Sequence, residues 1–230
     1  MSSAGVAGLY SLAGRVRAPL DVALPVRVGG FGGVSGLVQF VQDNWITHVV
    51  DATHPFAAQM SRNACAACDA TNTPLIALTR APWVQTTTEN WQTVPDVDAA
   101  VHALSGSPRR VFLAVGRRHL AEFGARPQHY YLLRTVDPLN KAPFASCETV
   151  VARGPFTADG DAALMRKHQI DLVVSKNAGG SGAEAKIIAA RNLGVPVLMI
   201  DRPQLPHRRE THSIDEVMRW LGHGAADLGV

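Results

Sequence analysis

The chain has 230 residues, of which 47% are hydrophobic and 18% charged, a balance that excludes a disordered or fibrous protein. This length is enough for one large domain or two small ones. The net charge is only +3, aromatic residues make up 6%, and no basic run occurs, so the composition does not indicate a nucleic-acid-binding protein. It is compatible with a small anionic ligand.

The first half of the chain alternates apolar runs with glycine-marked or proline-marked turns. Apolar runs without polar alternation are typical of parallel strands, and apolar residues spaced by three or four are typical of helices. The predicted elements are strands at 9–15, 25–28, 46–50 and 73–80, helices at 34–44 and 57–70, and a short strand and helix within 89–104.

The second half repeats this alternation. It is predicted to contain strands at 111–116, 130–136, 148–154, 170–175 and 196–200, and helices at 117–123, 159–168, 183–191 and 213–220. Residues 50–74 and 174–196 share one order of strand end, turn, helix and proline, which indicates one supersecondary design used twice.

These elements predict an α/β fold with parallel sheets. Residues 105–108 (SGSP) have the composition of a linker, so we expect two Rossmann-like domains, at 1–106 and 107–230. Each would be a parallel sheet flanked by helices, with a ligand cleft between the domains beyond the carboxyl ends of the strands.

The cysteines and the hydropathy bear on the compartment. Cys65, Cys68 and Cys147 are too few for a disulfide scaffold and are typical of a reducing compartment. Cys65 and Cys68 form a CxxC inside a helical run, which favours buried thiols over a redox or zinc pair. No apolar stretch is long enough for a membrane span, and no secretion signal opens the chain. The sequence therefore predicts a soluble, cytoplasmic protein.

Polar groups gather where the predicted strands end, and arginine is prominent among them. Arginine suits the bidentate recognition of carboxylates and phosphates, although a single arginine can equally be a solvated rim residue. The set comprises Ser11, Arg15, the segment from Gly29 to Gly33, Asp51, Thr53, His54, Gly116, Arg117, Arg118, Arg134, Arg153, Ser175, Lys176 and Asn177.

The segment SLAGR bears on the choice of cofactor. At the end of the second strand of a dinucleotide fold, an acid selects NAD, whereas an arginine accommodates the 2′-phosphate of NADP. Here the strand ends with Ser11 and Arg15, and no acid occurs before Asp21. If this is a dinucleotide site, it favours NADP(H).

The loop KNAGGSG, at 176–182, has two interpretations. Backbone N–H groups of a glycine-rich turn that enters a helix can receive a phosphate or carboxylate, with Lys176 at the mouth of the loop. Alternatively, its glycines serve only a tight turn and close helix packing, because the loop matches neither GxGxxG nor a Walker motif.

The turn DATHPF, at 51–56, raises a similar choice. His54 precedes a proline, which keeps its backbone extended and outside the following helix. It either orients a ligand or transfers a proton, or it caps the helix start. No Ser-His-Asp order and no metal-ligand spacing are evident, so no metal site is predicted.

Several segments taken together resemble one family. THVVDATHPFAAQMS, VFLAVGRRHLAEF, VVARGPF and LVVSKNAGGSGAEAKIIAARNLGVPVLMIDRP, in this order, are similar to the precorrin-6A reductases of cobalamin biosynthesis, the CobK/CbiJ family. The resemblance runs from about Leu9 to Leu221. It implies an NADPH-dependent reduction of one double bond of the precorrin-6A macrocycle to give precorrin-6B, a small-molecule tetrapyrrole as partner, and two Rossmann-like domains. A monomer is compatible with this, and the oligomeric state stays open.

The resemblance also implies roles for the strand-end residues. Those expected to bind the cofactor are Ser11, Arg15, Gly29, Gly30, Asp51, Thr53, His54, Pro55 and Phe56. Those expected to bind the substrate are Arg117, Arg118, Arg153, Lys176, Asn177, Gly179 and Gly180. His54 and Lys176 are the candidate proton donors, with water as the alternative.

One departure from the family leaves rival interpretations. Family members begin with a further strand and a glycine-rich loop of the GGTxEAR kind, and this chain starts after them. We expect a misassigned start, with a truncated, non-catalytic tetrapyrrole-binding or nucleotide-binding module as the rival. Reduction of a cobalt-containing precorrin-6A is a second, enzymatic rival.

Overall fold

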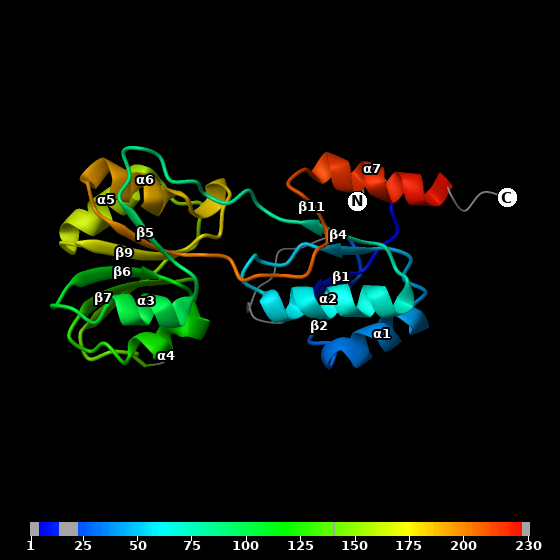
Figure 1. Ribbon diagram of the computed structural model, residues 1–230, viewed down its shortest axis with the longest axis horizontal. Coiled ribbons are helices and arrows are strands. Elements are labelled where there is room, and N and C mark those ends of the chain that lie inside the picture. The colour runs from blue at the N-terminus through cyan, green and yellow to red at the C-terminus, as the bar shows by residue number, and fades with distance from the viewer. Residues whose placement is uncertain (1–4, 14–22, 140, 227–230) are drawn as a thin grey trace. The chain divides into compact units, whose positions relative to one another are not determined.

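The computed structural model describes residues 5–13, 23–139 and 141–226, which form two compact units (Figure 1). Unit 1 comprises Met1–Thr79 and Leu205–Val230, and unit 2 comprises Arg80–Gln204. No helix in the described ranges is long and apolar enough to cross a membrane.

Unit 2 is built on a six-stranded sheet whose strand pairs are all parallel. In sheet order the strands are β5 (Trp91–Val94), β10 (Val197–Ile200), β9 (Leu172–Lys176), β6 (Arg110–Ala114), β7 (Tyr130–Thr135) and β8 (Cys147–Val151). The central strands are apolar runs covered on both faces, and Phe112, Val173 and Met199 are almost fully buried.

Helices cover both faces of this sheet (Figure 1). One face carries α5 (Ala158–Lys167) and α6 (Ala185–Leu193), and the other carries α3 (Val97–Ala103) and α4 (Leu120–Phe123). Short 3-10 turns, η2 (Arg117–His119) and η3 (Ser181–Ala183), precede α4 and α6. Asp96 and Thr157 accept backbone N–H bonds as N-caps of α3 and α5, which explains where these helices begin.

Unit 1 contains two smaller parallel sheets. One has the order β11 (Arg209–Thr211), β4 (Leu75–Leu78) and β3 (Val49–Asp51), and the other pairs β1 (Tyr10–Leu12) with β2 (Val26–Val28). The helices are α1 (Gly33–Asp43), α2 (Ala58–Thr71) and α7 (Ile214–Ala226). Leu37 and Val41 of α1 pack with Ala64 and Ala67 of α2 in a small core.

The predicted α/β class, with parallel sheets flanked by helices, is confirmed. The boundaries of the units differ from the predicted division at residue 106. Strand β5 belongs to unit 2 because it pairs with β10, where Trp91 lies opposite Val197. Strand β11 belongs to unit 1 because it pairs with β4, where Arg209 lies opposite Ile76. These pairings join segments more than a hundred residues apart, and the sequence carries no local signal of them.

The buried helical thiols predicted from the CxxC are confirmed. Cys65 and Cys68 are free, buried residues of α2. Burial raises the pKa of Cys65 and raises that of Cys68 to about 11. Both side chains therefore stay protonated at neutral pH and lack the reactivity of a redox pair.

Candidate active site

The carboxyl ends of β6, β9 and β10 lie side by side in unit 2. The parallel register sets Ala114 opposite Ser175, and Lys176 opposite Ile200. The loops that follow these strands therefore begin at one edge of the sheet, the edge at which open α/β sheets bind ligands. These loops carry most of the predicted substrate-binding residues.

Lys176 is the last residue of β9 and is partly buried. Burial, followed by the charge of Arg118, lowers the pKa of Lys176 to about 8, against a smaller opposing effect of Glu122. An ammonium group with this pKa keeps its proton at neutral pH and releases it more readily than an ordinary lysine. The side chain thus has the protonation state that a general acid needs.

The turn after β6 begins at Gly116, whose φ of 78° is a left-handed conformation that favours glycine. The guanidinium of Arg117 donates to the carbonyl oxygens of Asp137 and Pro138. Arg118 is exposed. Arg117 and Arg118 are thus both at the surface, and the hydrogen bonds of Arg117 tie this turn to the chain after β7.

Asn177 and the glycines that follow it hold a neighbouring segment of the chain. The Asn177 amide accepts a hydrogen bond from the Trp83 N–H (2.8 Å) and donates one to the Trp83 carbonyl (3.0 Å). The Trp83 indole N–H donates to the Gly180 carbonyl (3.0 Å). At Gly179, φ is 67° and a Cβ would lie 2.1 Å from the Ala81 oxygen, so no other residue fits. Close packing therefore explains these glycines, and ligand binding by the loop stays a prediction.

Two further arginines at this end of unit 2 differ in exposure. Arg134 is buried in an ion pair with Asp161 and lies 3.6 Å from the ring centroid of Phe156. Its position among the strand-end residues is therefore explained by packing. Arg153 is exposed two residues after β8, and its role in substrate binding stays a prediction.

In unit 1, Asp51 organises the turn that follows β3. Its carboxylate accepts hydrogen bonds from the Thr53 N–H (3.0 Å), the Thr53 hydroxyl (2.7 Å), the Ser61 hydroxyl (2.7 Å) and Arg208 (2.5 Å). Burial raises the pKa of Asp51, but the bonds from Ser61 and Thr53 and the charge of Arg208 outweigh it and lower the pKa. Asp51 is only 6% exposed, so it and Thr53 shape the turn from within.

His54 lies at the surface of this turn. Its Nδ1 accepts a hydrogen bond from the Phe56 N–H (3.2 Å), and its ring centroid lies 5.9 Å from that of Phe56. The bond goes to the turn and not to the first N–H groups of α2, which begins at Ala58. His54 therefore stabilises the turn locally, while Pro55 and Phe56 are half-buried beside it.

Strands β1 and β2 pair in parallel, and their middle residues, Ser11 and Arg27, lie opposite each other. The Arg27 guanidinium donates to the Ser11 hydroxyl (3.1 Å) and to the carbonyl oxygens of Gly29 (2.9 Å) and Gly30 (2.8 Å). Arg15 lies outside the described residues. Arg27 is not among the residues predicted from the sequence. Its position one residue before the end of β2 could have marked it as a strand-end arginine.

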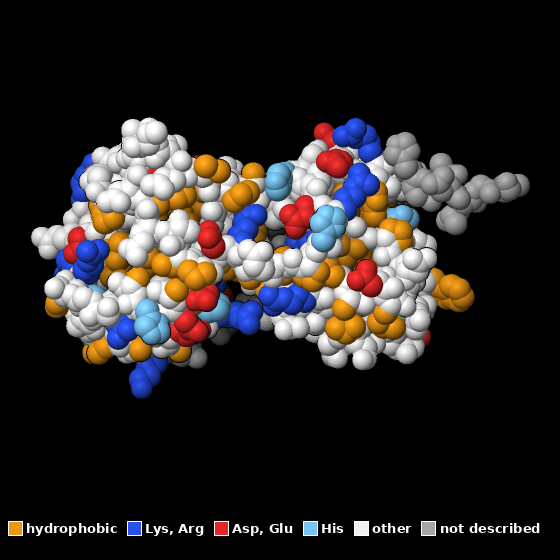
Figure 2. Space-filling model, viewed as in Figure 1, with side chains coloured by type: hydrophobic (Ala, Val, Ile, Leu, Met, Phe, Trp, Pro, Cys, Tyr) orange, Lys and Arg blue, Asp and Glu red, His pale blue; other side chains and the backbone are white. Residues whose placement is uncertain are grey.

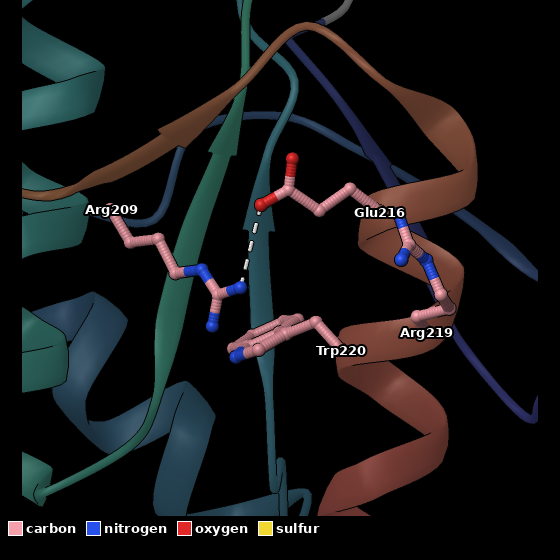
Figure 3. Close-up of a pocket in the computed structure, with 4 residues that line it drawn as sticks. All are labelled: Arg209, Glu216, Arg219 and Trp220. Atoms are coloured by element: carbon pink, nitrogen blue, oxygen red, sulfur yellow. Dashed lines mark hydrogen bonds and ion pairs between the residues drawn. The ribbon is translucent and has the colours of Figure 1, made fainter.

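Two surface hollows are lined by other residues than these. One, of about 310 Å³, is lined by Arg209 of β11 and by Glu216, Arg219 and Trp220 of α7, and Arg209 pairs with Glu216 at 3.4 Å (Figure 3). The other, of about 390 Å³, lies at the amino ends of β9 and β10 and includes Leu172 and Val197. Neither coincides with the carboxyl ends of the strands.

On the face shown in Figure 2, acidic and basic side chains are interspersed over each unit.

Comparison with known proteins identifies the relatives of the chain. A model of the precorrin-6x reductase family, CbiJ/CobK, matches residues 1–222. The chain belongs to this family. It is 53% identical to the precorrin-6A reductase of Rhodobacter capsulatus, over all of this chain and 92% of the relative. A solved structure, CobK precorrin-6A reductase, matches with a TM-score of 0.89 and 53% identity, over 94% of this chain and 86% of that one. The cobalt-precorrin-6A reductase of Synechocystis sp. is 29% identical, over 86% of this chain and 79% of the relative.

Within this member of the precorrin-6x reductase family, the structure adds residues that the sequence reasoning did not assign. Besides Arg27, they are Trp83, Arg202 and Arg208, which fix the predicted loops by hydrogen bonds. Arg202 donates from Nε to the Asn177 carbonyl (2.9 Å) and from its terminal nitrogen to the Ala178 carbonyl (3.2 Å). The contacts of Trp83, Arg202 and Arg208 have no local sequence signature, because they join parts of the chain that lie 24 or more residues apart.

Proposed function

We propose that the chain catalyses the NADPH-dependent reduction of one macrocycle double bond of precorrin-6A, giving precorrin-6B, in cobalamin biosynthesis. The observation that carries this proposal is the 53% identity, over the whole chain, to the precorrin-6A reductase of Rhodobacter capsulatus. The lower identity to the Synechocystis cobalt-precorrin-6A reductase favours a metal-free substrate.

Unit 1 is proposed to bind the cofactor. Ser11 and Arg27 bring a hydroxyl and a guanidinium to the ends of β1 and β2, and this chemistry suits the 2′-phosphate that distinguishes NADPH from NADH. Arg15 is proposed to join them, and Gly29 and Gly30 to lie against the pyrophosphate. The DATHPF turn, held rigid by Asp51 from within, is assigned to the nicotinamide half.

When bound, the nicotinamide supplies the hydride, so the protein needs mainly to place and protonate the substrate. Arg118 and Arg153, both exposed at strand ends of unit 2, are assigned to substrate carboxylates, together with Arg117. Lys176 is assigned as the principal proton donor, because it is a partly buried ammonium with a pKa of about 8. Asn177, Gly179 and Gly180 hold the loop that carries it.

The cofactor assignment is tested by Ser11→Asp, which places a carboxylate where the 2′-phosphate is expected. NADPH affinity, measured by fluorescence titration, should fall at least tenfold, because two negative charges would lie close together. NADH affinity should change by less than threefold. Arg219→Ala, on the exposed face of α7, serves as the control, because it also makes the net charge of the protein one unit more negative. Equal losses of affinity for NADPH and NADH would show that Ser11 does not lie at the 2′-phosphate.

A further inference from the structure

Lys186, the second residue of α6, is a buried cation. It is 4% exposed, and among the described residues it belongs to no ion pair. Its ammonium donates to the Ala183 carbonyl (2.5 Å) and lies 4.7 Å from the ring centroid of Trp83. A lysine is almost never buried in this way without a carboxylate partner.

The charged groups around Lys186 do not compensate it. Arg134 of β7 and Asp161 of α5 are committed to each other in a buried ion pair, so the three charges together leave one net positive charge. Burial, followed by Arg134, lowers the pKa of Lys186 to about 8, against the opposing effect of Asp161. An apolar side chain of the same length would avoid the cost of burying this charge.

The ammonium contacts the 176–183 loop in two ways. It binds the loop directly at the Ala183 carbonyl, in η3. It also lies against the indole of Trp83, whose N–H holds the Gly180 carbonyl and whose backbone is held by Asn177. Lys186 therefore holds the loop at its end and, through Trp83, near its middle.

We propose that Lys186 is a positioning residue that fixes the 176–183 loop for ligand binding, at a cost to the stability of the fold. The link to catalysis rests on the proposed function, in which this loop carries the proton donor. The positioning itself rests only on the contacts of Lys186 with Ala183 and Trp83. If Lys186 positions the loop at such a cost, removing its charge should raise the melting temperature. If its role were purely to stabilise the fold, the same change should lower the melting temperature.

The test is Lys186→Met, which keeps the length of the side chain and removes the charge, with Lys167→Met on the surface of α5 as the control. At pH 7 the melting temperature of Lys186→Met should rise by about 5 °C, because the buried charge is gone. The ratio kcat/KM for precorrin-6A should fall about tenfold. The control should change neither quantity measurably.

A readout without substrate separates this proposal from the proposed function. In a background that keeps Trp83 as the sole tryptophan, Lys186→Met should raise acrylamide quenching of Trp83 about twofold, because the loop is less firmly held. The wild-type side chain should also give a Trp83 fluorescence titration with a midpoint near pH 8 that Lys186→Met abolishes. A lower melting temperature or unchanged quenching would overturn the positioning role. Absence of turnover by the wild-type protein would overturn only the proposed function.

Discussion

Arg208 donates a hydrogen bond to the carboxylate of Asp51 from 157 positions away in the sequence, and both side chains are buried. This bond ties the segment before β11 to the turn after β3. Thr53 and Ser61 supply the remaining donors, so the carboxylate is surrounded by hydrogen bonds. The shape of the DATHPF turn therefore depends on the return of the chain to unit 1 after residue 204.

Asp51→Asn should destabilise unit 1 strongly. The substitution removes the buried carboxylate partner of Arg208 and leaves it paired with the more exposed Glu210. Removing one partner of a buried ion pair costs about 3–5 kcal/mol in the free energy of unfolding, and the remaining pair with Glu210 places the expected loss at the lower end of this range. Glu210→Gln removes the exposed carboxylate that also pairs with Arg208 and should cost at most about 1 kcal/mol. Urea unfolding measures both values, and equal small losses would show that the Asp51 pair carries little stability.

The same pair predicts an acid-dependent stability. The folded-state pKa of Asp51 is lowered from its ordinary value of 3.8, so its contribution is present in full above pH 3.8. It is lost as the pH falls below that value, through the folded pKa. Urea unfolding between pH 5 and pH 2 should show this loss in the wild type and a shallower slope in Asp51→Asn. Parallel slopes would contradict the lowered pKa.

Asn177→Ala should loosen the segment around Trp83. The substitution removes two hydrogen bonds and leaves the Trp83 N–H and carbonyl without these partners in a buried position, a cost of about 2–4 kcal/mol. The matched control is Asn44→Ala at the exposed end of α1, with an expected cost below about 1 kcal/mol. The measurement is the urea midpoint of each variant. Similar midpoints would show that the hydrogen bonds between Asn177 and Trp83 contribute little to stability.

These three predictions show where sequence reasoning reached its limit. Continuous apolar runs around Phe112, Val173 and Met199 were enough to predict parallel strands, because the pattern is local. Asp51 pairs with Arg208, and the Ala81 carbonyl leaves no room for a side chain at Gly179. No local sequence pattern predicts either contact. The sequence therefore predicted which strand ends carry polar residues, but not which of those residues face inward, as Asp51 and Asn177 do.

His54→Ala should lower turnover of precorrin-6A without unfolding the protein. The side chain is exposed, and in the described residues its Nδ1 bonds to the Phe56 N–H, so its loss should change the melting temperature little. Steady-state rates at several pH values are the measurement. Unchanged turnover at every pH would remove His54 from the candidate proton donors.

Lys176 as proton donor predicts a pH profile with a defined sign. A general acid acts only while protonated, so kcat should be constant at lower pH and fall as the pH rises through about 8. Lys176→Met should lower kcat and abolish this alkaline limb, whereas Lys167→Met, on the surface of α5, should keep it. A limb retained in Lys176→Met would assign the titration to another group.

The central claim is that this member of the precorrin-6x reductase family turns over its macrocycle and does not merely bind it. The most direct test mixes the purified protein with precorrin-6A and NADPH and follows the absorbance of the reduced nicotinamide together with the mass of the product. The predicted result is one NADPH consumed for each macrocycle, and a product heavier by one hydride and one proton. Binding of precorrin-6A with no consumption of NADPH would contradict the claim and leave a non-catalytic binding module.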